Sequence, residues 1–547
     1  MRFSLGRCTV ALSAALGVTF PAGCLPRPVP VPIVSPSPPP AAPSPAVQGS
    51  PGASVSAPPV TSSPAPASSA PAQPVATAAA AAVPSFSQLA SDATDTLLQR
   101  YFDPRGGWKL CPDPVCPSVN RDWGVDSLTY TLYLRWKTTR DNALVPPMNA
   151  LIATAPNYPP PCRGLTGVLC TWSDVANWDA VADMREFEVT GGNLSALGNA
   201  INAFETVEQS NIYTGGACKA IRYQQPYAYL DRIKTLETEA TAVKAALLLF
   251  DATGQRRYLD LATKHYTAAR LYFLDRYTPL YTAFVFDRGG SCTQLPRRFF
   301  ASVNGEMISD GIGLFHATGN GNYFDQAVAT ANAVDSRLSD PNGVFADLLA
   351  DNDVAEPLVE AMYQLASDEG LRFARSWLLR NAAAVASSRK PDGSYPRFFD
   401  GPPAPGTVTA WQTNGGFSLM IAAAALAPSD TPASVTAWDG ASTIKDTISK
   451  LPATLHFTGS GIALIGTLGD LCCQPGHARV FIDGRETFDE TGIWQNSSSA
   501  LRRFPGSVLF AWRWPTAGAH TLRFEPGKLN LKEGFSYLHS TSYVLAR

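Results

Sequence analysis

Residues 171–190, TWSDVANWDAVADMREFEVT, have the pattern of a helix start that carries chemically active side chains. Ser173 and Asp174 are residue types that favour the N-cap position. Apolar side chains then recur at roughly helical spacing, at Trp178, Val181, Ala182 and Phe187. Residues 174–186 of this stretch contain four carboxylates: Asp174, Asp179, Asp183 and Glu186. Carboxylates near a helix start can also serve only as caps or as partners of the helix dipole, so the rest of the chain must decide between these roles.

The composition bounds the class of protein. With 547 residues, the chain is long enough for two or more domains with full cores. The net charge is −2 and 16% of residues are charged, below the roughly 25% of average soluble domains. The absence of a basic block argues against a nucleic-acid partner. A weakly charged chain with 11 Trp suits a sugar ligand, although tryptophans also simply pack in cores.

The N-terminus reads as a targeting segment. Arg2 and Arg7 precede an apolar run at 9–20 that is too short to span a membrane, which predicts a secretory signal over 1–24. Ala22-Gly23-Cys24 resembles a bacterial lipoprotein box, with Pro21 where Leu is expected. We expect a secreted or cell-surface bacterial protein that Cys24 anchors to a lipid surface such as the outer membrane; plain signal cleavage is the alternative.

Residues 25–84 are nearly all Pro, Ala, Ser and Val and cannot build a core, so they predict a disordered tether. Ten cysteines fit an oxidising compartment. Short sequence separations pair Cys111 with Cys116 and Cys162 with Cys170, which leaves Cys218 for Cys292. The adjacent Cys472 and Cys473 are predicted to be free. The histidines form no metal-ligand pattern with these cysteines, and we expect no metal and no cofactor.

A repeated phrase organises the helical part of the chain. An apolar helix end, Thr-Gly and a new helix appear as FEVTGG at 187–192, FDATGQRRYLDLA at 250–262 and FHATGNGNYFDQA at 315–327. Gly after an apolar helix end is typical of a C-cap. Each unit is therefore a helical hairpin, and hairpins must stack to bury their apolar faces.

Further helices are predicted at 87–102, 126–139, 234–250, 359–370, 373–388 and 415–426. Leu236, Ala240, Val243, Leu247 and Phe250 share one stripe that we interpret as core. About six hairpins fit this pattern, and six hairpins that close on themselves make an (α/α)6 toroid, which we assign to 85–429. The fold class is mainly α.

These phrases resemble family 76 of the glycoside hydrolases, the endo-α-1,6-mannanases with an (α/α)6 toroid. The resemblance covers roughly residues 86–426. It rests on DVANWDAVADMREFEVTGG, on the two later Thr-Gly hairpins, on FFASVNGEMISDGIGLFHATG at 299–319 and on WLLRNAAAVASSRKPDGSYPRFFDGP at 377–402. It implies a retaining mechanism, in which one carboxylate attacks and a second carboxyl protonates the leaving oxygen. In the family these are two adjacent aspartates, the nucleophile and the general acid/base.

This chain departs from the family at the second aspartate. Asp174 matches the nucleophile, but Val175 stands at the position of the acid and cannot hold a proton. Trp178 matches the first Trp of the family motif, and Asp179 replaces the second. We expect Asp174 and Asp179 as catalytic residues, with Asp183, Glu237 or Glu239 as other substitutes for the acid.

The predicted sugar contacts are Trp172, Trp178, Asn304 and Asp287. Ser302-Val303-Asn304-Gly305 departs from the Tyr-Asn-Gln-Gly that is usual in the family. Several of the candidate catalytic and sugar-binding residues also have a purely structural interpretation. In that interpretation Asp179 is a solvated or capping carboxylate, Glu237 and Glu239 are helix-face charges, and Asp287 is a turn residue.

From residue 430 onward, apolar residues recur at about every second position instead of at helical spacing. Strands are predicted at 455–459, 461–468, 478–483, 507–514 and 520–525, with Asp483-Gly484 as a hairpin turn and Thr516-Ala517-Gly518 between the last two strands. This pattern predicts a jelly-roll-like β-sandwich over 430–547. Phe510, Trp512 and Trp514 share one face, either as core or as a platform for sugars.

Together the patterns predict a glycoside hydrolase, most similar to α-1,6-mannanases, that acts as a monomer on a polysaccharide or oligosaccharide and has no nucleic-acid partner. Two alternatives remain open at this point. The toroid could be an inactive glycan-binding surface lipoprotein, or the chain could be a structural envelope protein. A second carboxylate opposite Asp174 would favour the enzyme, whereas a central groove without Trp and carboxylates would favour the structural protein.

Overall fold

The computed structural model describes residues 83–105, 107–117, 127–154, 173–210, 216–221, 233–288, 290–294, 299–346, 354–403, 405–432, 438–446, 448, 451–469, 476–493, 503–526 and 540–546. The predicted signal, nearly all of the tether and the lipid acceptor Cys24 lie outside these residues. Cys162, Cys170, Cys472 and Cys473 also lie outside them. In the described ranges, none of the helices combines the length and the apolar character needed to cross a bilayer.

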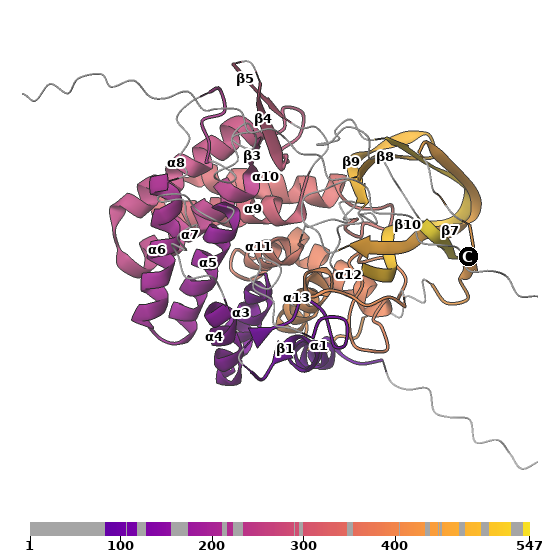
Figure 1. Cartoon of the computed structure of the whole chain (residues 1–547), viewed down its shortest axis with the longest axis horizontal. Coiled ribbons are helices and arrows are strands. Elements are labelled where there is room, and N and C mark those ends of the chain that lie inside the picture. The colour runs from indigo at the N-terminus through magenta and orange to yellow at the C-terminus, as the bar shows by residue number, and fades with distance from the viewer. Residues whose placement is uncertain are drawn as a thin grey trace, which may run out of the picture. The chain divides into compact units, whose positions relative to one another are not determined.

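Six helices of the described chain form an inner ring: α3 (Leu128–Thr139), α5 (Ser173–Val189), α7 (Leu236–Thr253), α9 (Ala301–Thr318), α11 (Glu356–Ser367) and α13 (Ala410–Leu426). Each packs against the next, and α13 packs against α3, so the ring closes. Six more helices cover it: α1 (Phe86–Tyr101), α4 (Val145–Thr154), α6 (Leu194–Ser210), α8 (Arg256–Phe273), α10 (Gly321–Arg337) and α12 (Arg372–Ser387). In Figure 1 the colours run around the ring in chain order until α13 lies beside α1. The predicted toroid is confirmed.

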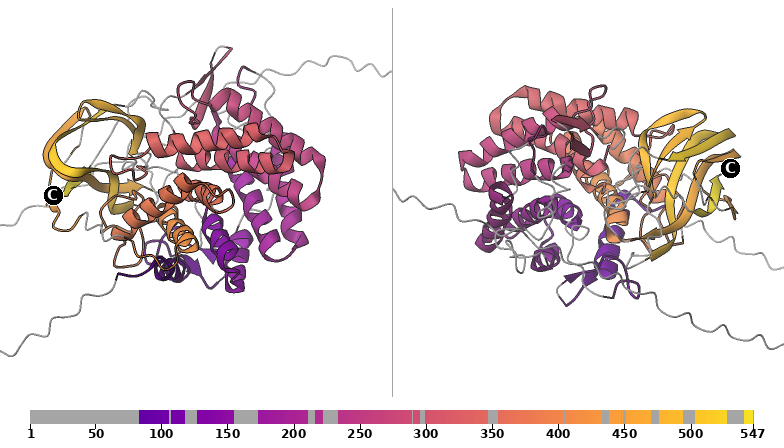
Figure 2. Two further views of the ribbon diagram at one scale, coloured as in Figure 1. Left: turned by 180° about the vertical axis from the view of Figure 1, so that it is seen from behind. Right: turned by 45° about the horizontal axis from the view of Figure 1, so that its top comes forward.

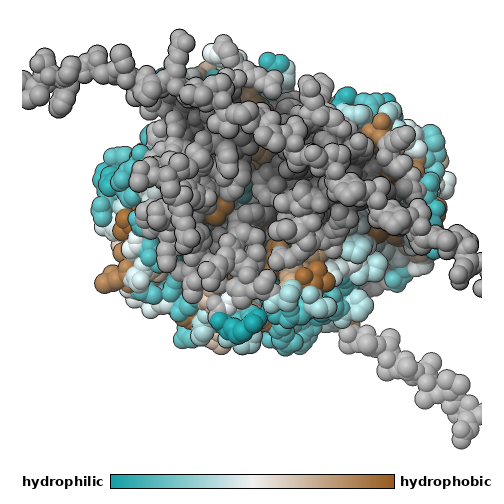
Figure 3. All heavy atoms as spheres, in the orientation of Figure 1, coloured by the Kyte–Doolittle hydropathy of each residue, from teal (hydrophilic) through white to brown (hydrophobic). Residues whose placement is uncertain are grey.

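The two layers differ in how their helices are buried. The inner helix α13 is buried over nearly its whole length, with side chains of every direction inside the protein. The outer helix α8 buries a single stripe that includes Tyr258, Leu259 and Ala262, as the repeat predicts. Amphipathic outer helices leave polar side chains for solvent, and the coloured rim in Figure 3 is mostly hydrophilic with small separate hydrophobic groups.

The Thr-Gly phrases form the turns between inner and outer helices. Gly191, Gly254 and Gly319 have φ of 70°, 65° and 72°, the left-handed region that closes a helix. The N–H of Gly254 donates to the carbonyl of Phe250 at 2.7 Å, and the N–H of Gly319 repeats this bond at 2.8 Å. The predicted hairpin repeat is therefore confirmed in its backbone geometry.

Short strands and disulfides brace the helical ring. Strands β1 (Phe102–Asp103) and β2 (Gly107–Trp108) pair, and β3 (Ile233–Thr235), β4 (Phe284–Arg288) and β5 (Ser291–Gln294) form a small antiparallel sheet. A short 3-10 helix (Asn142–Leu144) joins α3 to α4. The predicted disulfides Cys111–Cys116 and Cys218–Cys292 are both present.

After α13 the chain forms an antiparallel sheet with the strand order β6-β11-β7-β10-β8-β9. The strands are β6 (Ser442–Ile444), β7 (Ala453–Gly469), β8 (Gly476–Ile482), β9 (Arg485–Ile493), β10 (Arg503–Pro526) and β11 (Ser540–Ala546). Asp483 and Gly484, with φ of 51° and 79°, make the predicted hairpin turn between β8 and β9.

Two strands are longer than predicted. Strand β7 joins the segments 455–459 and 461–468, and β10 joins 507–514 and 520–525. The prediction that Thr516-Ala517-Gly518 separates two strands was wrong. Arg513 pairs with Gly461 and Gly518 pairs with Gly459, so the intervening residues bulge out of one continuous ladder. Bulges and turns use similar small residues, which is why the two look alike in sequence.

The long strand β10 folds over on itself. An extended strand would place Phe510 and Phe524 roughly 46 Å apart at about 3.3 Å per residue. Their ring centroids lie only 5.5 Å apart. The sheet therefore curls at the bulge, as Figure 2 shows for the yellow strands, and its two halves face each other across a core. This arrangement confirms the predicted β-sandwich.

Candidate active site

All six inner helices of the described ring run in the same direction, because an outer helix returns the chain after each one. One end of the ring therefore gathers the first turns of the inner helices, and we call it the N-terminal end. The opposite end carries the Thr-Gly turns, and we call it the turn end. Asp174 lies in the first turn of α5, so the predicted nucleophile belongs to the N-terminal end.

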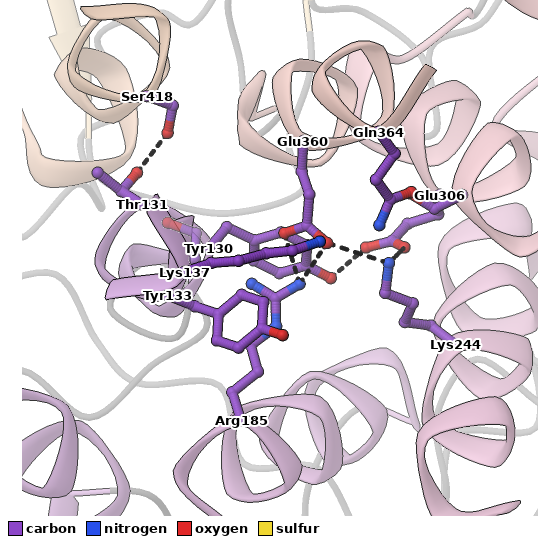
Figure 4. Close-up of polar contacts among 12 residues, drawn as sticks. Tyr130, Thr131, Tyr133, Lys137, Arg185, Lys244, Glu306, Glu360, Gln364 and Ser418 are labelled. Atoms are coloured by element: carbon purple, nitrogen blue, oxygen red, sulfur yellow. Dashed lines mark hydrogen bonds and ion pairs between the residues drawn. The ribbon is translucent and has the colours of Figure 1, made fainter. Parts of the chain in front are cut away.

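Buried charged side chains meet at the centre of the ring. Arg185 of α5 donates to Glu360 of α11, across the ring, at 2.6 and 2.9 Å. Lys244 of α7 lies 3.3 Å from Glu360 and 3.9 Å from Glu306 of α9. The hydroxyl of Tyr130 on α3 donates to Glu306. Figure 4 shows these five side chains converging from five inner helices, and together they form what we call the axial cluster.

Within the axial cluster the charges compensate one another. Burial alone would raise the pKa of Glu360, but Arg185 and Lys244 outweigh it and hold that pKa at about 2. The guanidinium of Arg185 also lies over the ring of Tyr130, 3.9 Å from its centroid. Burial raises the pKa of Glu306, against the effect of Lys244. The cluster therefore contains an ionised Glu360 paired with two buried cations, which is the condition for tolerating charges in a protein interior.

The axial cluster shows which side of each inner helix faces the ring axis. At about 100° per residue, Asp174 lies only about 20° from Arg185 around α5, so it points toward the axis at the N-terminal end. By the same count Glu237 lies about 20° from Lys244 on α7, and Glu356 lies about 40° from Glu360 on α11. The N-terminal end of the axis is therefore lined by three carboxylates from three helices.

Asp174 and Glu237 are neighbours among these carboxylates. Their helices α5 and α7 pack together. The side-chain amide of Asn177, one turn into α5, donates to the carbonyl of Thr238 at 3.1 Å. The first turns of the two helices thus lie side by side, and the carboxylates of Asp174 and Glu237 both face the axis there. Both side chains are partly exposed, whereas Glu356 is buried.

The electrostatics at the N-terminal end favour proton transfer. Burial raises the pKa of Asp174 to about 7, although backbone N–H groups of Val175 and of Asp174 itself lower it. One carboxylate oxygen of Asp174 is buried without a hydrogen bond in the described part of the chain. Burial also raises the pKa of Glu356 to about 8, against hydrogen bonds from its own backbone and from Asn414 and Ser127. Carboxyls with pKa values near neutrality are typical of catalytic sites.

The other predicted substitutes for the acid do not face the axis. Asp179 and Asp183 lie about 140° and about 180° from Asp174 around α5. Glu239 lies about 140° from Lys244, and its carboxylate contacts His265 of α8 at 2.7 Å and accepts from the N–H of Ile221. Of the four predicted substitutes for the missing acid, only Glu237 points toward the ring axis, as Asp174 does.

The predicted sugar contacts have structural partners. Trp178 is buried, with its ring centroid 5.2 Å from that of Tyr130. The amide of Asn304 bonds the backbone of Tyr281 at 2.9 and 3.1 Å. The carboxylate of Asp287 accepts from the N–H groups of Ala217 and Cys218 at 2.8 and 3.3 Å, beside the disulfide to Cys292. Trp172 lies outside the described residues.

Sequence reasoning missed the axial cluster. The available signal was a charged residue inside an otherwise apolar helix, such as Lys244 within ATAVKAALLLF, because buried charges are rare unless they are paired. The partners lie too far apart in sequence for their pairing to be read from spacing. In the residues that the structure describes, no group of three or more His, Cys, Asp or Glu side chains could hold a metal ion.

The helical ring is similar to solved structures of glycoside hydrolases. The α-1,6-mannanase of Salegentibacter sp. HEL1_6 has a TM-score of 0.53 and 19% identity, over 62% of this chain and 99% of that one. The family 76 α-mannanase of Bacteroides thetaiotaomicron has a TM-score of 0.51 and 18% identity, over 62% and 95%.

Two further structures are variants of the Salegentibacter enzyme that are described as inactive. They carry Asn or Ala at two consecutive aspartates and hold α-1,6-mannotriose or α-1,6-mannotetrose. No protein-family model and no curated protein matches this sequence. At these identities the likeness concerns the fold, and the ring of this chain has the fold of the family 76 glycoside hydrolases.

Proposed function

We propose that the chain is a retaining glycosidase that cleaves an α-linked glycan, with α-1,6-mannan as the first substrate to test. Asp174 is the nucleophile and Glu237 is the general acid. The observation that carries this proposal is the pair of acidic residues, both partly exposed, that face the ring axis from the adjoining first turns of α5 and α7. The solved structures of the same fold, which hold α-1,6-linked mannose oligomers, support the choice of substrate.

In this mechanism an oxygen of Asp174 attacks the anomeric carbon while Glu237 gives its proton to the leaving glycosidic oxygen. Water then attacks the glycosyl ester, and Glu237 takes a proton from that water, so that the anomeric configuration is retained. Val175 plays no part in either step. The proton donor is instead Glu237 on the next inner helix, α7, and not the residue that follows the nucleophile on α5.

The axial cluster sets the depth of the site. Arg185 and Lys244 bridge from α5 and α7 to Glu360 on α11, so paired side chains occupy the axis below the N-terminal end. A glycan that enters from that end meets Asp174 and Glu237 before it reaches the cluster. We assign the cluster a supporting role, because its charges are already paired with one another.

The test compares the purified protein with Asp174→Asn and Glu237→Gln, using α-1,6-mannan and a panel of other α-glycans. Both variants should release reducing ends about 10²- to 10⁴-fold more slowly than the wild type. Azide should speed Glu237→Gln only where the second step is slow, because azide attacks the glycosyl ester without the help of a general base. Glu188→Gln is the matched control, because Glu188 is an exposed carboxylate at the turn end of the same helix α5.

Each outcome separates the alternatives. Full activity in Glu237→Gln, with activity lost in Asp174→Asn, would reject Glu237 as the acid. Glycan binding without cleavage on every substrate would favour the inactive glycan-binding protein, for which the loss of an aspartate at Val175 is the motivating observation. Neither binding nor cleavage would reject a glycan function altogether.

We also propose that the protein is exported and held at the bacterial surface by a lipid on Cys24. This proposal rests on the lipoprotein-like box and the Pro/Ala-rich tether of the sequence. Labelled palmitate should be incorporated into the wild type and not into Cys24→Ala. Equal labelling of both proteins, or none of either, would reject the anchor.

A further inference from the structure

A cavity of about 560 Å³ lies where the end of α10 and the turn after it meet strands β8, β9 and β10. Its volume is within the range of about 300–1,000 Å³ that is typical of small-ligand sites. The residues that matter for its chemistry are Arg337, Asp483, Arg485, Glu486, Trp512 and Trp514. None of them belongs to the axial cluster or to the N-terminal carboxylates described above.

Contacts beside this cavity, outside its lining, join the helical part of the chain to the sheet. Arg513, next to Trp512, forms an ion pair of 2.7 Å with Asp400 of the helical part. The indole of Trp438 donates to the carbonyl of Asp400 at 3.1 Å. Phe398 packs in a small apolar cluster with Ala463 and Val508 of the sheet. The cavity is therefore preformed, which lowers the entropic cost of binding.

The two tryptophans of the cavity have different surroundings. Trp514 is covered on one face by His520, which stacks on it with 3.8 Å between ring centroids. Nδ1 of His520 donates to the carboxylate of Asp483 at 2.9 Å. Trp512 is half-buried, and its indole N–H has no hydrogen-bond partner in the described chain. That N–H is itself buried, so what Trp512 offers to a ligand is the apolar surface of its ring along the cavity wall.

The charges around the cavity balance. Arg337 and Arg485 carry positive charge, and Asp483 and Glu486 carry negative charge. A strongly charged ligand would meet repulsion from one of the two pairs. A neutral polyhydroxyl ligand meets no such repulsion, and a sugar ring can cover apolar indole surface.

The cavity also lies at the N-terminal end of the ring. The outer helix α10 ends at Arg337, and the chain then leads to Glu356, the first residue of the inner helix α11. We propose that this cavity is a second glycan site, in which Trp512 binds a neutral oligosaccharide segment. That its ligand is an α-linked glycan rests on the proposed function; that it binds a neutral saccharide does not.

The test measures binding by titration calorimetry with α-1,6-mannotetraose, with a neutral gluco-oligosaccharide and with a sulfated oligosaccharide. The full chain carries Asp174→Asn to block hydrolysis. Trp512→Ala should weaken the binding of the neutral oligosaccharides at one of the two sites at least about tenfold. Arg485→Ala changes an exposed residue and leaves the core intact, and it should weaken the same binding severalfold. Trp136→Phe is the control, because the indole N–H of Trp136 is also unpartnered in the described chain but lies on α3, outside the cavity.

In the active chain, Trp512→Ala should raise KM for polysaccharide about tenfold and leave kcat on a short substrate unchanged. Unchanged binding in both Trp512→Ala and Arg485→Ala, or stronger binding of the sulfated probe than of the neutral ones, would overturn the proposal. If no glycan is cleaved but Trp512-dependent binding of neutral saccharide remains, the proposed function fails and the cavity site stands.

Discussion

The two ends of the helical ring are built from the same helices by opposite means. At the turn end the connections are short, at 190–193, 254–255, 319–320 and 368–371. At the N-terminal end long segments join the outer helices to the next inner ones, over 155–172, 274–300, 338–355 and 388–409. Short turns give stability to a repeat fold, whereas long connections supply residues for binding and catalysis.

The polar groups at the two ends also differ, in their hydrogen bonds and in their pKa values. At the turn end the threonine hydroxyls bond locally, as when Thr253 donates to Leu249 and Thr318 to Leu314, both at 2.6 Å. At the N-terminal end, Asp174 and Glu356 are held with pKa values of about 7 and 8 because burial disfavours their charged forms. The local hydrogen bonds therefore stabilise the turn end. At the N-terminal end, the buried carboxyls with pKa values near 7 reduce the stability of the fold.

The largest effect is expected from a substitution of Asp174, which tests whether the N-terminal end carries the catalytic function. Asp174→Asn should reduce the hydrolysis rate about 10²- to 10⁴-fold. Since the folded-state pKa of Asp174 is raised, the native state binds its proton more tightly than the unfolded state, and the carboxylate destabilises the fold as pH rises through about 7. The variant should therefore unfold at higher denaturant than the wild type at pH 8 and at equal denaturant at pH 4.

The activity profile of the wild type sharpens the same prediction. If Asp174 is the nucleophile, kcat/KM should rise with pH through about 7, because attack needs the ionised carboxylate. A profile that falls through that pH would make Asp174 the acid and Glu237 the nucleophile. A loss of stability at every pH in Asp174→Asn would break the proposed division between the ends.

The second prediction concerns the axial cluster, which lies between the ends. Glu360→Gln leaves the buried Arg185 and Lys244 without their shared carboxylate, and should lower the free energy of unfolding by about 3–5 kcal/mol. Urea unfolding measures the change. Asp260→Asn is the control, since its pair with Arg256 is exposed and should contribute no more than about 0.5 kcal/mol. Equal losses in the two variants would mean that the cluster does not stabilise the ring.

The sequence allowed the turn end to be predicted well and the N-terminal end poorly. The Thr-Gly turns are local signals, because the hydrogen bonds that close them join residues four apart. Asp174 was predicted as the nucleophile through the resemblance of its segment to a family motif. Glu237 could not be chosen over Asp179 or Glu239 from sequence, because the axis direction becomes known only when Arg185 meets Glu360.

Two other differences have similar physical reasons. The bonds between the amide of Asn304 and the backbone of Tyr281 were not predicted, because the two residues become adjacent only in the folded ring. The contact of Asn304 with sugar stays a prediction. The bulge in β10 was mistaken for a turn because the hydrogen bonds that continue the ladder come from β7, which lies earlier in the chain. Contacts between distant segments decide both cases.

The third prediction concerns a second group at the N-terminal end whose raised pKa lowers the free energy of unfolding as pH rises, as for Asp174. Buried His265 lies between Glu239 and Glu208, at 2.7 and 2.5 Å, and these carboxylates raise its pKa to about 9 although burial opposes this. The stabilisation is complete below the unfolded value of about 6.5 and is lost as pH rises through about 9. The unfolding free energy should fall by on the order of 3 kcal/mol between pH 6.5 and 9.5.

His265→Gln provides the comparison for this prediction. The variant should be less stable than the wild type at pH 6, and its stability should vary little over the same range. Thermal or urea unfolding at several pH values measures both curves. Parallel curves for the two proteins would show that another group causes the alkaline loss.

The smallest effect is expected at the turn end. Gly254→Ala and Gly319→Ala place a Cβ at φ of 65° and 72°, where no atom clashes but the left-handed backbone costs an L-residue about 1–2 kcal/mol. Gly321→Ala is the matched control, because Gly321 begins α10 with open space and ordinary φ, and alanine there should stabilise by up to about 1 kcal/mol. All three variants should keep wild-type kcat/KM, since they lie at the end away from Asp174. A loss of activity larger than the loss of stability in either turn variant would show that the two ends are coupled through the inner helices rather than separate in function.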